Sequence, residues 1–298
     1  MKLKAWIQAA RLRTLPLSLS GIIVGSFAAY ANGFWNGNIF ALAMLTTLFL
    51  QVLSNFANDL GDSYKGADNE YRVGPQRAIQ SGAISQKNMT FAVVLTSIFA
   101  LSTSIPLIIL GTSSMPSPVL WTYVFLAFSC ILAAITYTVG KKAYGYNGLG
   151  DVMVFIFFGL VSVLGVYTLY AKSFDSSIIG LALTVGLLSV AVLNLNNMRD
   201  RVNDANVGKN TLVVKMGELN AKRYHTTLIV LAFLGFLATL IFNQWWWGFI
   251  ALIPFSVLFV HLKKVWSVRE PRDLDPELKK VALSTFAIAV LFLISTLL

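Results

Sequence analysis

The chain has 298 residues, of which 56% are hydrophobic and only 12% are charged. Soluble domains carry roughly twice that share of charged residues, so this composition excludes an ordinary soluble protein and indicates a polytopic membrane protein. The net charge of +10 suits anionic lipid headgroups and anionic substrates, whereas we expect no nucleic-acid partner because the basic residues are scattered over predicted membrane loops.

Runs without Asp, Glu, Lys or Arg locate the predicted spans in chain order. The first sixteen residues are basic and lack a small-residue cleavage site, so they are interpreted as an interfacial helix and not as a removed signal. Each of three long runs fits two helices of about 20 residues, and each of three shorter runs fits one. The long runs cover residues 14–58, 88–140 and 224–262, and the short runs cover residues 152–171, 176–198 and 281–298. The sequence therefore predicts an all-α fold with nine transmembrane helices.

The distribution of charge predicts the orientation. Three of the turns between paired spans, NGFWNGN, TSSMPSP and NQWWWG, carry no charge, and the loop with Lys172 and Asp175 falls on the same side. All other Lys and Arg, and all other acids, fall on the opposite side, which the positive-inside rule makes cytoplasmic. We expect the N-terminus and any chemistry on the cytoplasmic side, and the C-terminus across the membrane.

An acidic stripe follows the second predicted span, in the stretch NFANDLGDSYKGADN. Asn55, Asn58, Asp59 and Asp62 stand at i, i+3, i+4 and i+7, so they share one face of a continued helix. Asp68 lies further on, after Gly66, outside this spacing. The alternative interpretation, without a functional site, is that these acids are solvated loop charges that balance nearby Lys and Arg.

A matching stripe ends the sixth predicted span. In NLNNMRDRVNDANVGKNTL, Asn197, Asp200 and Asp204 stand at i, i+3 and i+7. The two stripes lie four helices apart on the same side, which indicates a single transmembrane domain of two weakly related halves, at about residues 14–140 and 151–262, plus a ninth helix. Because two matching stripes occur at equivalent helix ends, solvated loop charges are the weaker interpretation of these acids.

Several carboxylates at one membrane edge repel each other unless cations lie among them. Carboxylate and amide oxygens suit Mg²⁺, which keeps waters and is commonly completed by substrate phosphates. Two such helix ends therefore predict a diphosphate ligand. His225 and His261 are expected to stand alone near span ends, so no zinc site is predicted, and Cys130 is expected to be a small packing residue.

Basic residues near the stripes are candidates for contact with that anion, because Arg offers a fork of donors and Lys a point charge. They are Arg72, Arg77, Lys141, Lys142 and Lys209. Arg11 and Arg13 either join them or meet lipid headgroups. Taken singly, each is also explained as a topology determinant.

Over nearly its whole length the chain resembles the UbiA-type intramembrane aromatic prenyltransferases. NDLGD matches the family pattern N-D-x-x-D, and DRVND matches D-x-x-x-D. The stretches ARLRTLPLSLSGIIVG, KGADNEYRVGPQRAIQSG and YTVGKKAYGYNGLGDVMVFIFFG resemble the branch that prenylates 1,4-dihydroxy-2-naphthoate in menaquinone biosynthesis. Where the broad family often has a third acid, this chain has Gly66, with Asp68 two residues later, as in that branch.

The resemblance implies a central cavity with a cytoplasmic cap, in a bacterial plasma membrane, and transfer of a polyprenyl chain from its diphosphate to the naphthoate with loss of CO₂. The implied metal site is two Mg²⁺ ions on Asp59, Asp62, Asp200 and Asp204, with Asn58, Asn197 and Asp68 as further ligands. Asn55 and the basic residues would bind the diphosphate. Arg13, Tyr144 and Asp151 are the expected acceptor site, and few of the phenylalanines of VMVFIFFG, or Tyr170, are expected to face the allyl cation.

Other functions remain as alternatives. A related enzyme acting on another aromatic acid such as 4-hydroxybenzoate would share the two aspartate motifs. CDP-alcohol phosphotransferases use one contiguous aspartate motif, unlike the two separated stripes here. A cation-coupled transporter would place ionisable residues near the middle of its spans, where this sequence has none. No oligomeric state is predicted.

Overall fold

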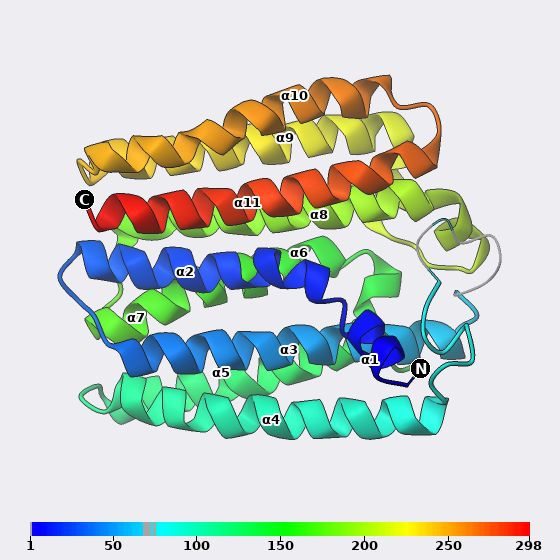
Figure 1. Cartoon of the computed structure of the whole chain (residues 1–298), viewed down its shortest axis with the longest axis horizontal. Coiled ribbons are helices and arrows are strands. Elements are labelled where there is room, and N and C mark those ends of the chain that lie inside the picture. The colour runs from blue at the N-terminus through cyan, green and yellow to red at the C-terminus, as the bar shows by residue number, and fades with distance from the viewer. Residues whose placement is uncertain (1, 68–72, 74–75) are drawn as a thin grey trace.

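The structure is a computed structural model that describes residues 2–67, 73 and 76–298. The described chain is helical, and nine of its helices are long and apolar enough to cross a membrane, which confirms the predicted fold class. The longer helices lie side by side, with the N-terminus and the C-terminus at opposite ends of the bundle (Figure 1). The helices are α1 (Lys2–Ala10), α2 (Leu15–Ala31), α3 (Gly37–Tyr64), α4 (Gln86–Thr112), α5 (Ser117–Thr136), α6 (Gly150–Val154), α7 (Val166–Ala171), α8 (Ile179–Asn206), α9 (Leu212–Phe242), α10 (Ile253–Ser267) and α11 (Asp275–Thr296).

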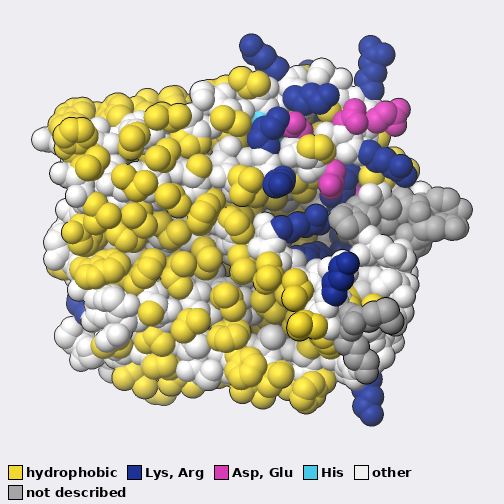
Figure 2. Space-filling model, in the orientation of Figure 1, with side chains coloured by type: hydrophobic (Ala, Val, Ile, Leu, Met, Phe, Trp, Pro, Cys, Tyr) yellow, Lys and Arg dark blue, Asp and Glu magenta, His cyan; other side chains and the backbone are white. Residues whose placement is uncertain are grey.

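Charged side chains gather at the end of the bundle that holds the N-terminus, and apolar side chains cover most of the rest (Figure 2). We call the first the charged end and the opposite one the far end. The helices α3 and α8 continue past their apolar runs into the charged end. Both acidic stripes are therefore helical, as their spacing predicts.

The N-terminal helix α1 is separate from α2, as predicted, and it packs against α3. The chain bends between them at Arg11, which adopts a left-handed conformation with φ 48°. Asn55 on α3 fixes this bend because its amide donates to the Ala10 carbonyl oxygen at 2.8 Å. The bend directs the Arg11 side chain towards the acids of α3.

The fifth span combines α6, a π-helical stretch at Phe155–Gly165, and α7. The π-helix is rare and often occurs at functional sites, because its wider turn re-aims side chains. Gly159 of this stretch approaches Gly186 of α8 so closely that a Cβ on Gly159 would lie 2.8 Å from the Gly186 Cα. The fifth span is therefore held tightly against α8.

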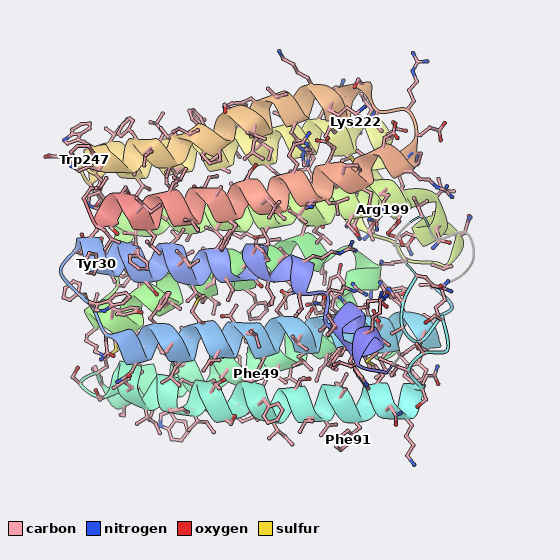
Figure 3. The ribbon with its side chains drawn as sticks, in the orientation of Figure 1. Tyr30, Phe49, Phe91, Arg199, Lys222 and Trp247 are labelled. Carbon is pink, nitrogen blue, oxygen red and sulfur yellow. The ribbon has the colours of Figure 1, made fainter. Side chains whose placement is uncertain are left out.

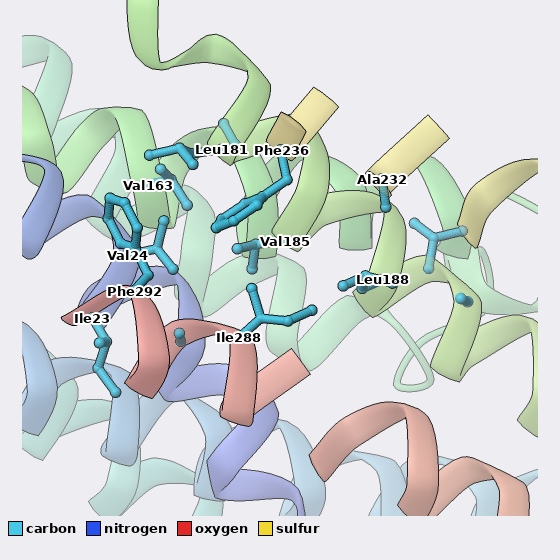
Figure 4. Packing of buried hydrophobic residues seen from close by; sticks show 14 of the residues in the cluster. Ile23, Val24, Val163, Leu181, Val185, Leu188, Ala232, Phe236, Ile288 and Phe292 are labelled. Atoms are coloured by element: carbon cyan, nitrogen blue, oxygen red, sulfur yellow. The ribbon is translucent and has the colours of Figure 1, made fainter. Parts of the chain in front are cut away.

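Buried apolar residues form two principal clusters. The larger joins α2, the fifth span and α8–α11, where Leu181, Phe236 and Phe292 pack together (Figure 4). The smaller joins α1, α3, α4 and α5 around Leu53 and Met89. The cavity described next lies between these clusters.

Candidate active site

A cavity of about 1250 Å³ runs into the bundle from the charged end. Its walls come from α1–α5, the fifth span, α8 and α11. Arg11, Asp59 and Asp62 line its mouth, and apolar residues such as Leu107 and Val166 line its depth. The shape suits a ligand with a charged head and a long apolar tail.

The first acidic stripe lies on this wall. Asp59 and Asp62 are 1% and 3% exposed, respectively. The Arg11 guanidinium donates to Asp59, and Arg77 Nη1 lies 2.6 Å from Asp62 Oδ2 and 3.6 Å from Asp59 Oδ1. Arg77 also donates to the Asn58 carbonyl oxygen at 2.7 Å. Buried carboxylates are thus neutralised by arginines from outside their helix.

Close packing of α3 brings the residues after α5 to this stripe. Gly61 leaves room for Thr138, whose Oγ1 would lie 2.5 Å from a Cβ at that position. Thr138 donates to the Ala57 carbonyl oxygen at 2.9 Å and to Asn58 Oδ1 at 3.3 Å. Asn58 is thereby fixed beside the two aspartates.

The second stripe lies on α8 and is paired with its own basic residues. Arg199 donates to both oxygens of Asp200, at 3.0 and 2.7 Å, and to Asp275 of α11 at 2.6 Å. Lys209 Nζ lies 3.4 Å from Asp204 Oδ1. Figure 3 shows Arg199 at the charged end, opposite Tyr30. Arg199 and Lys209 line the cavity, whereas Asp200 and Asp204 are buried behind that wall.

Tyr146 connects the two stripes. Its hydroxyl donates to Asp62 Oδ1 at 2.6 Å, and its backbone carbonyl accepts from Asn210 N at 3.0 Å. The ammonium groups of Lys65 and Lys209 lie 3.8 and 5.6 Å from its ring centroid. Burial, followed by the charge of Asp62, raises the pKa of Tyr146, so the hydroxyl stays a donor at neutral pH. The stripes therefore meet at one end of one cavity.

The donor set fits Mg²⁺. It consists of carboxylate and amide oxygens, the ligands this ion prefers. Asn197 Oδ1 and Asp204 Oδ2 are buried without a hydrogen-bond partner among the described residues, although buried polar atoms are normally satisfied. In the ranges described, no three His, Cys, Asp or Glu residues form a ready metal cluster.

The remaining predicted site residues differ in position. Arg13 and Tyr144 line the cavity. Lys141 and Lys142 are exposed outside it, and Asn55 holds the bend after α1 instead of facing the cavity. These three positions do not support the predicted contacts with diphosphate.

Asp151 is buried behind the wall, next to Tyr224, so its position does not support acceptor contact. Asp68 and Arg72 lie outside the described residues. In the fifth span, Phe157 and Phe158 line the cavity. Tyr170 does not line it, and its hydroxyl donates to Ser26 Oγ at 3.1 Å.

One expectation about histidine was wrong. His225 and His261 do not stand alone, because their Nε2 atoms lie 2.8 Å apart and His261 Nδ1 is bonded to Glu277. This buried group joins α9, α10 and α11. Cys130, expected to be a small packing residue, lines the cavity.

Arg199 and Tyr146 are absent from the predicted site although they hold its acids. Arg199 stands next to Asp200 in MRDRVND, which is a local signal for pairing. Tyr146 is 84 residues from Asp62, and no local pattern indicates their contact.

The fold and the site define a multi-pass helical membrane protein with an intramembrane cavity headed by paired carboxylates. A model described as the UbiA prenyltransferase family matches residues 18–294, and the chain belongs to that family. It is 43% identical to the 1,4-dihydroxy-2-naphthoate octaprenyltransferase of Haemophilus influenzae, over 98% of this chain and 95% of that one. The Escherichia coli enzyme of the same name is 38% identical, over 98% and 94% of the two chains.

Solved structures share the fold. A UbiA homolog from Aeropyrum pernix K1, in its apo form, has a TM-score of 0.70 at 15% identity, over 95% of this chain and 98% of that one. A UbiA homolog from Archaeoglobus fulgidus, bound to GPP and Mg²⁺, has a TM-score of 0.64 at 13% identity, over 98% of both chains. The predicted family is therefore confirmed by the sequence comparisons, and the solved structures show the same fold.

Proposed function

We propose that this protein transfers a polyprenyl chain from polyprenyl diphosphate to 1,4-dihydroxy-2-naphthoate, with loss of CO₂, in menaquinone biosynthesis. The observation that carries the proposal is the cavity. Asp59, Asp62, Asp275 and several basic residues line its mouth, Asp200 and Asp204 lie buried behind its wall, and its depth is apolar. The names of the relatives in Haemophilus influenzae and Escherichia coli support the choice of acceptor.

The reaction breaks the bond between prenyl C1 and the diphosphate oxygen, and the electron pair leaves with the diphosphate. The ring carbon that bears the carboxylate then forms a bond to C1. The carboxylate departs as CO₂ and returns its bonding pair to the ring, which gives the demethylated quinol. No proton has to be removed from the ring carbon, so the transfer step needs no general base.

The site has to stabilise the negative charge that develops on the leaving diphosphate. We assign Asp59, Asp62, Asp200 and Asp204 to hold two Mg²⁺ ions, with Asn58 and Asn197 as further ligands. When bound, these ions supply electrostatic stabilisation of the leaving group. Arg11, Arg77 and Lys209 already face this end of the cavity, and we assign them to the phosphate oxygens.

The acceptor needs a cationic partner for its carboxylate and a place near prenyl C1. Arg13 and Tyr144 line the cavity, and we assign them to this role. Apolar walls below them exclude water from the allyl cation. The single transmembrane domain of two related halves would then supply one acidic stripe from each half.

We place the charged end on the cytoplasmic side of a bacterial plasma membrane, in contact with its anionic lipids. Within the part of the chain that the structure describes, every Lys and Arg except Lys172 belongs to this end, as the positive-inside rule requires.

The test is an assay of purified protein with the naphthoate, a polyprenyl diphosphate and Mg²⁺. Prenylated quinol is expected, together with its loss on EDTA treatment and in the Asp59→Ala and Asp200→Ala variants. Removal of one charge-stabilising group typically costs 10²–10³-fold in kcat. The Asp175→Ala variant, at the far end, serves as the matched control. Strong activity towards 4-hydroxybenzoate with none towards the naphthoate would reject the proposed acceptor.

A further inference from the structure

The cavity ends before the far end of the bundle, at a floor built around Tyr123. Tyr123 of α5 is the sixth residue after Ser117, where that helix begins. Ala43 of α3 and Leu107 and Ile108 of α4 line the cavity four to six residues from the far ends of their helices, and Leu169 lines it two residues before the end of α7. The deepest lining residues therefore lie about 3–9 Å inside the far end, at 1.5 Å of rise per residue.

Tyr123 bridges two elements that otherwise leave space between them. Its hydroxyl donates to the Gly165 carbonyl oxygen at 2.7 Å, at the end of the π-helical stretch. The other principal packing partners of α5 are α3 and α4. The phenol ring thus lies as a bar between α5 and the fifth span.

Two groups of contacts lie at the far end, behind this bar. Phe27, Tyr30, Trp35, Phe40 and Tyr170 form an aromatic cluster, in which Trp35 stacks on Tyr170 with ring centroids 5.9 Å apart. Lys172 ties α4 to α7 by donating to the carbonyl oxygens of Gly111 at 2.6 Å and Leu169 at 2.8 Å. These contacts hold α2, α3, α4 and α7 together at the far end.

Above the bar, α5 presents no other aromatic side chain to the cavity. Ala127, Cys130 and Ala134 line the cavity along the face of α5 that carries Tyr123, at helical spacing, together with the aliphatic Leu126 and Ile131. The opposite face carries Trp121 and Phe125, which are 66% and 70% exposed. An aromatic residue on the inner face therefore occurs only where the cavity stops, within the span of α5.

The depth above Tyr123 corresponds to a definite chain length. Tyr137, beside Asp62 at the mouth, is fourteen residues from Tyr123, which is about 21 Å along a helix. An isoprene unit has four chain bonds of about 1.5 Å and advances about 5 Å when extended. An extended chain therefore reaches the bar after about four units.

We propose that Tyr123 is a specificity-determining residue that limits the extended prenyl chain to about four units and forces longer chains to bend. This inference rests on the proposed function, because it assumes a prenyl diphosphate as the ligand. The Tyr123→Ala change opens the floor and favours longer chains. The Ala127→Phe change raises the floor by about one helical turn, or 6 Å, and disfavours them while leaving room for about three units.

The experiment gives the full-length protein equal amounts of farnesyl diphosphate, with three units, and octaprenyl diphosphate, with eight, together with the naphthoate and Mg²⁺. The ratio of octaprenyl to farnesyl product is measured by mass spectrometry. We expect Tyr123→Ala to raise this ratio and Ala127→Phe to lower it, each on the order of tenfold, the scale of discrimination in an apolar pocket.

Two control variants separate the effect of side-chain size at the floor of the cavity from other effects of substitution. Tyr123→Phe keeps the ring without the hydroxyl and should keep the wild-type ratio, as should Trp121→Ala on the outer face. Active Tyr123→Ala and Ala127→Phe proteins with an unchanged ratio would overturn the inference, and Ala127→Phe decides alone if Tyr123→Ala does not fold. A wild-type protein that makes neither product rejects the proposed function instead.

Discussion

The four carboxylates assigned to Mg²⁺ are all paired with basic side chains. Arg77 holds Asp62, with Asp59 also within 3.6 Å, and Arg199 holds Asp200 through two hydrogen bonds. A cation that takes these carboxylates removes a counter-charge from buried guanidinium groups, which is costly. The diphosphate supplies that counter-charge. Cation and diphosphate should therefore bind together.

We expect the affinity for Mg²⁺ to rise by about tenfold when a non-reactive prenyl diphosphate analogue is present, within the usual range of coupling between ligands. Titration calorimetry with and without the analogue measures the effect. In Arg77→Gln, Mg²⁺ alone should bind more tightly than in the wild type and the analogue more weakly. Equal Mg²⁺ affinity in the wild type under both conditions would contradict this coupling.

At the level of residues, the sequence predicts which acids matter better than it predicts their partners. Asp59, Asp62, Asp200 and Asp204 follow from helical spacing and charge, which are local. The partners of these acids depend on tertiary contacts over long separations, such as the 48 residues between Arg11 and Asp59. The contact between His225 and His261 joins α9 to α10 in the same way, without a local pattern.

At the level of elements, the approach of α3 to the residues after α5 positions the first stripe. A Cβ at Gly61 would lie 2.5 Å from Thr138 Oγ1 and 2.6 Å from its backbone carbonyl carbon. Backbone cannot move aside as a side-chain tip can. Overpacking of this kind typically costs about 1–3 kcal/mol, more than the gain in helix propensity from glycine to alanine.

We therefore expect Gly61→Ala to lower both the thermal stability and the activity of the protein. Thermal unfolding in detergent and the prenylation assay measure these effects. Gly37→Ala, at the start of the same helix with no atom within 4 Å of the added Cβ, is the control and should behave like the wild type. A Gly61→Ala protein with normal activity and stability would show that α3 and Thr138 separate easily.

The spans themselves follow from the sequence because long charge-free runs have few alternatives in a membrane. Their ends do not, since α3, α8 and α9 extend beyond the apolar runs into polar sequence. The π-helical stretch of the fifth span is equally hidden, because VMVFIFFG has the composition of any apolar helix. The close approach of Gly159 in this stretch to α8 is a tertiary contact that the sequence does not indicate either.

At the level of the whole molecule, the cavity contains the one cysteine of the chain. We expect a small membrane-permeant maleimide to label Cys130, and a polyprenyl diphosphate analogue with Mg²⁺ to slow this labelling at least several-fold by filling the cavity. Mass spectrometry of the intact protein measures the rate. Inorganic diphosphate, which has no tail, is the control and should protect little. An equal labelling rate with and without the analogue would mean that its prenyl tail lies outside the cavity.

The walls of the cavity are not equally supported by neighbouring helices. In its most apolar window, the span Ser117–Thr136 is only 6% buried, whereas the span Ser176–Asn206 is 67% buried. The helix α5 thus has the cavity on one side and the bilayer on the other, while α8 is supported by α9 and α11. A bulky ligand therefore displaces α5 before it displaces α8. Because lipid supports the outer face of α5, the stiffness of the bilayer contributes to how well the cavity accommodates its ligand.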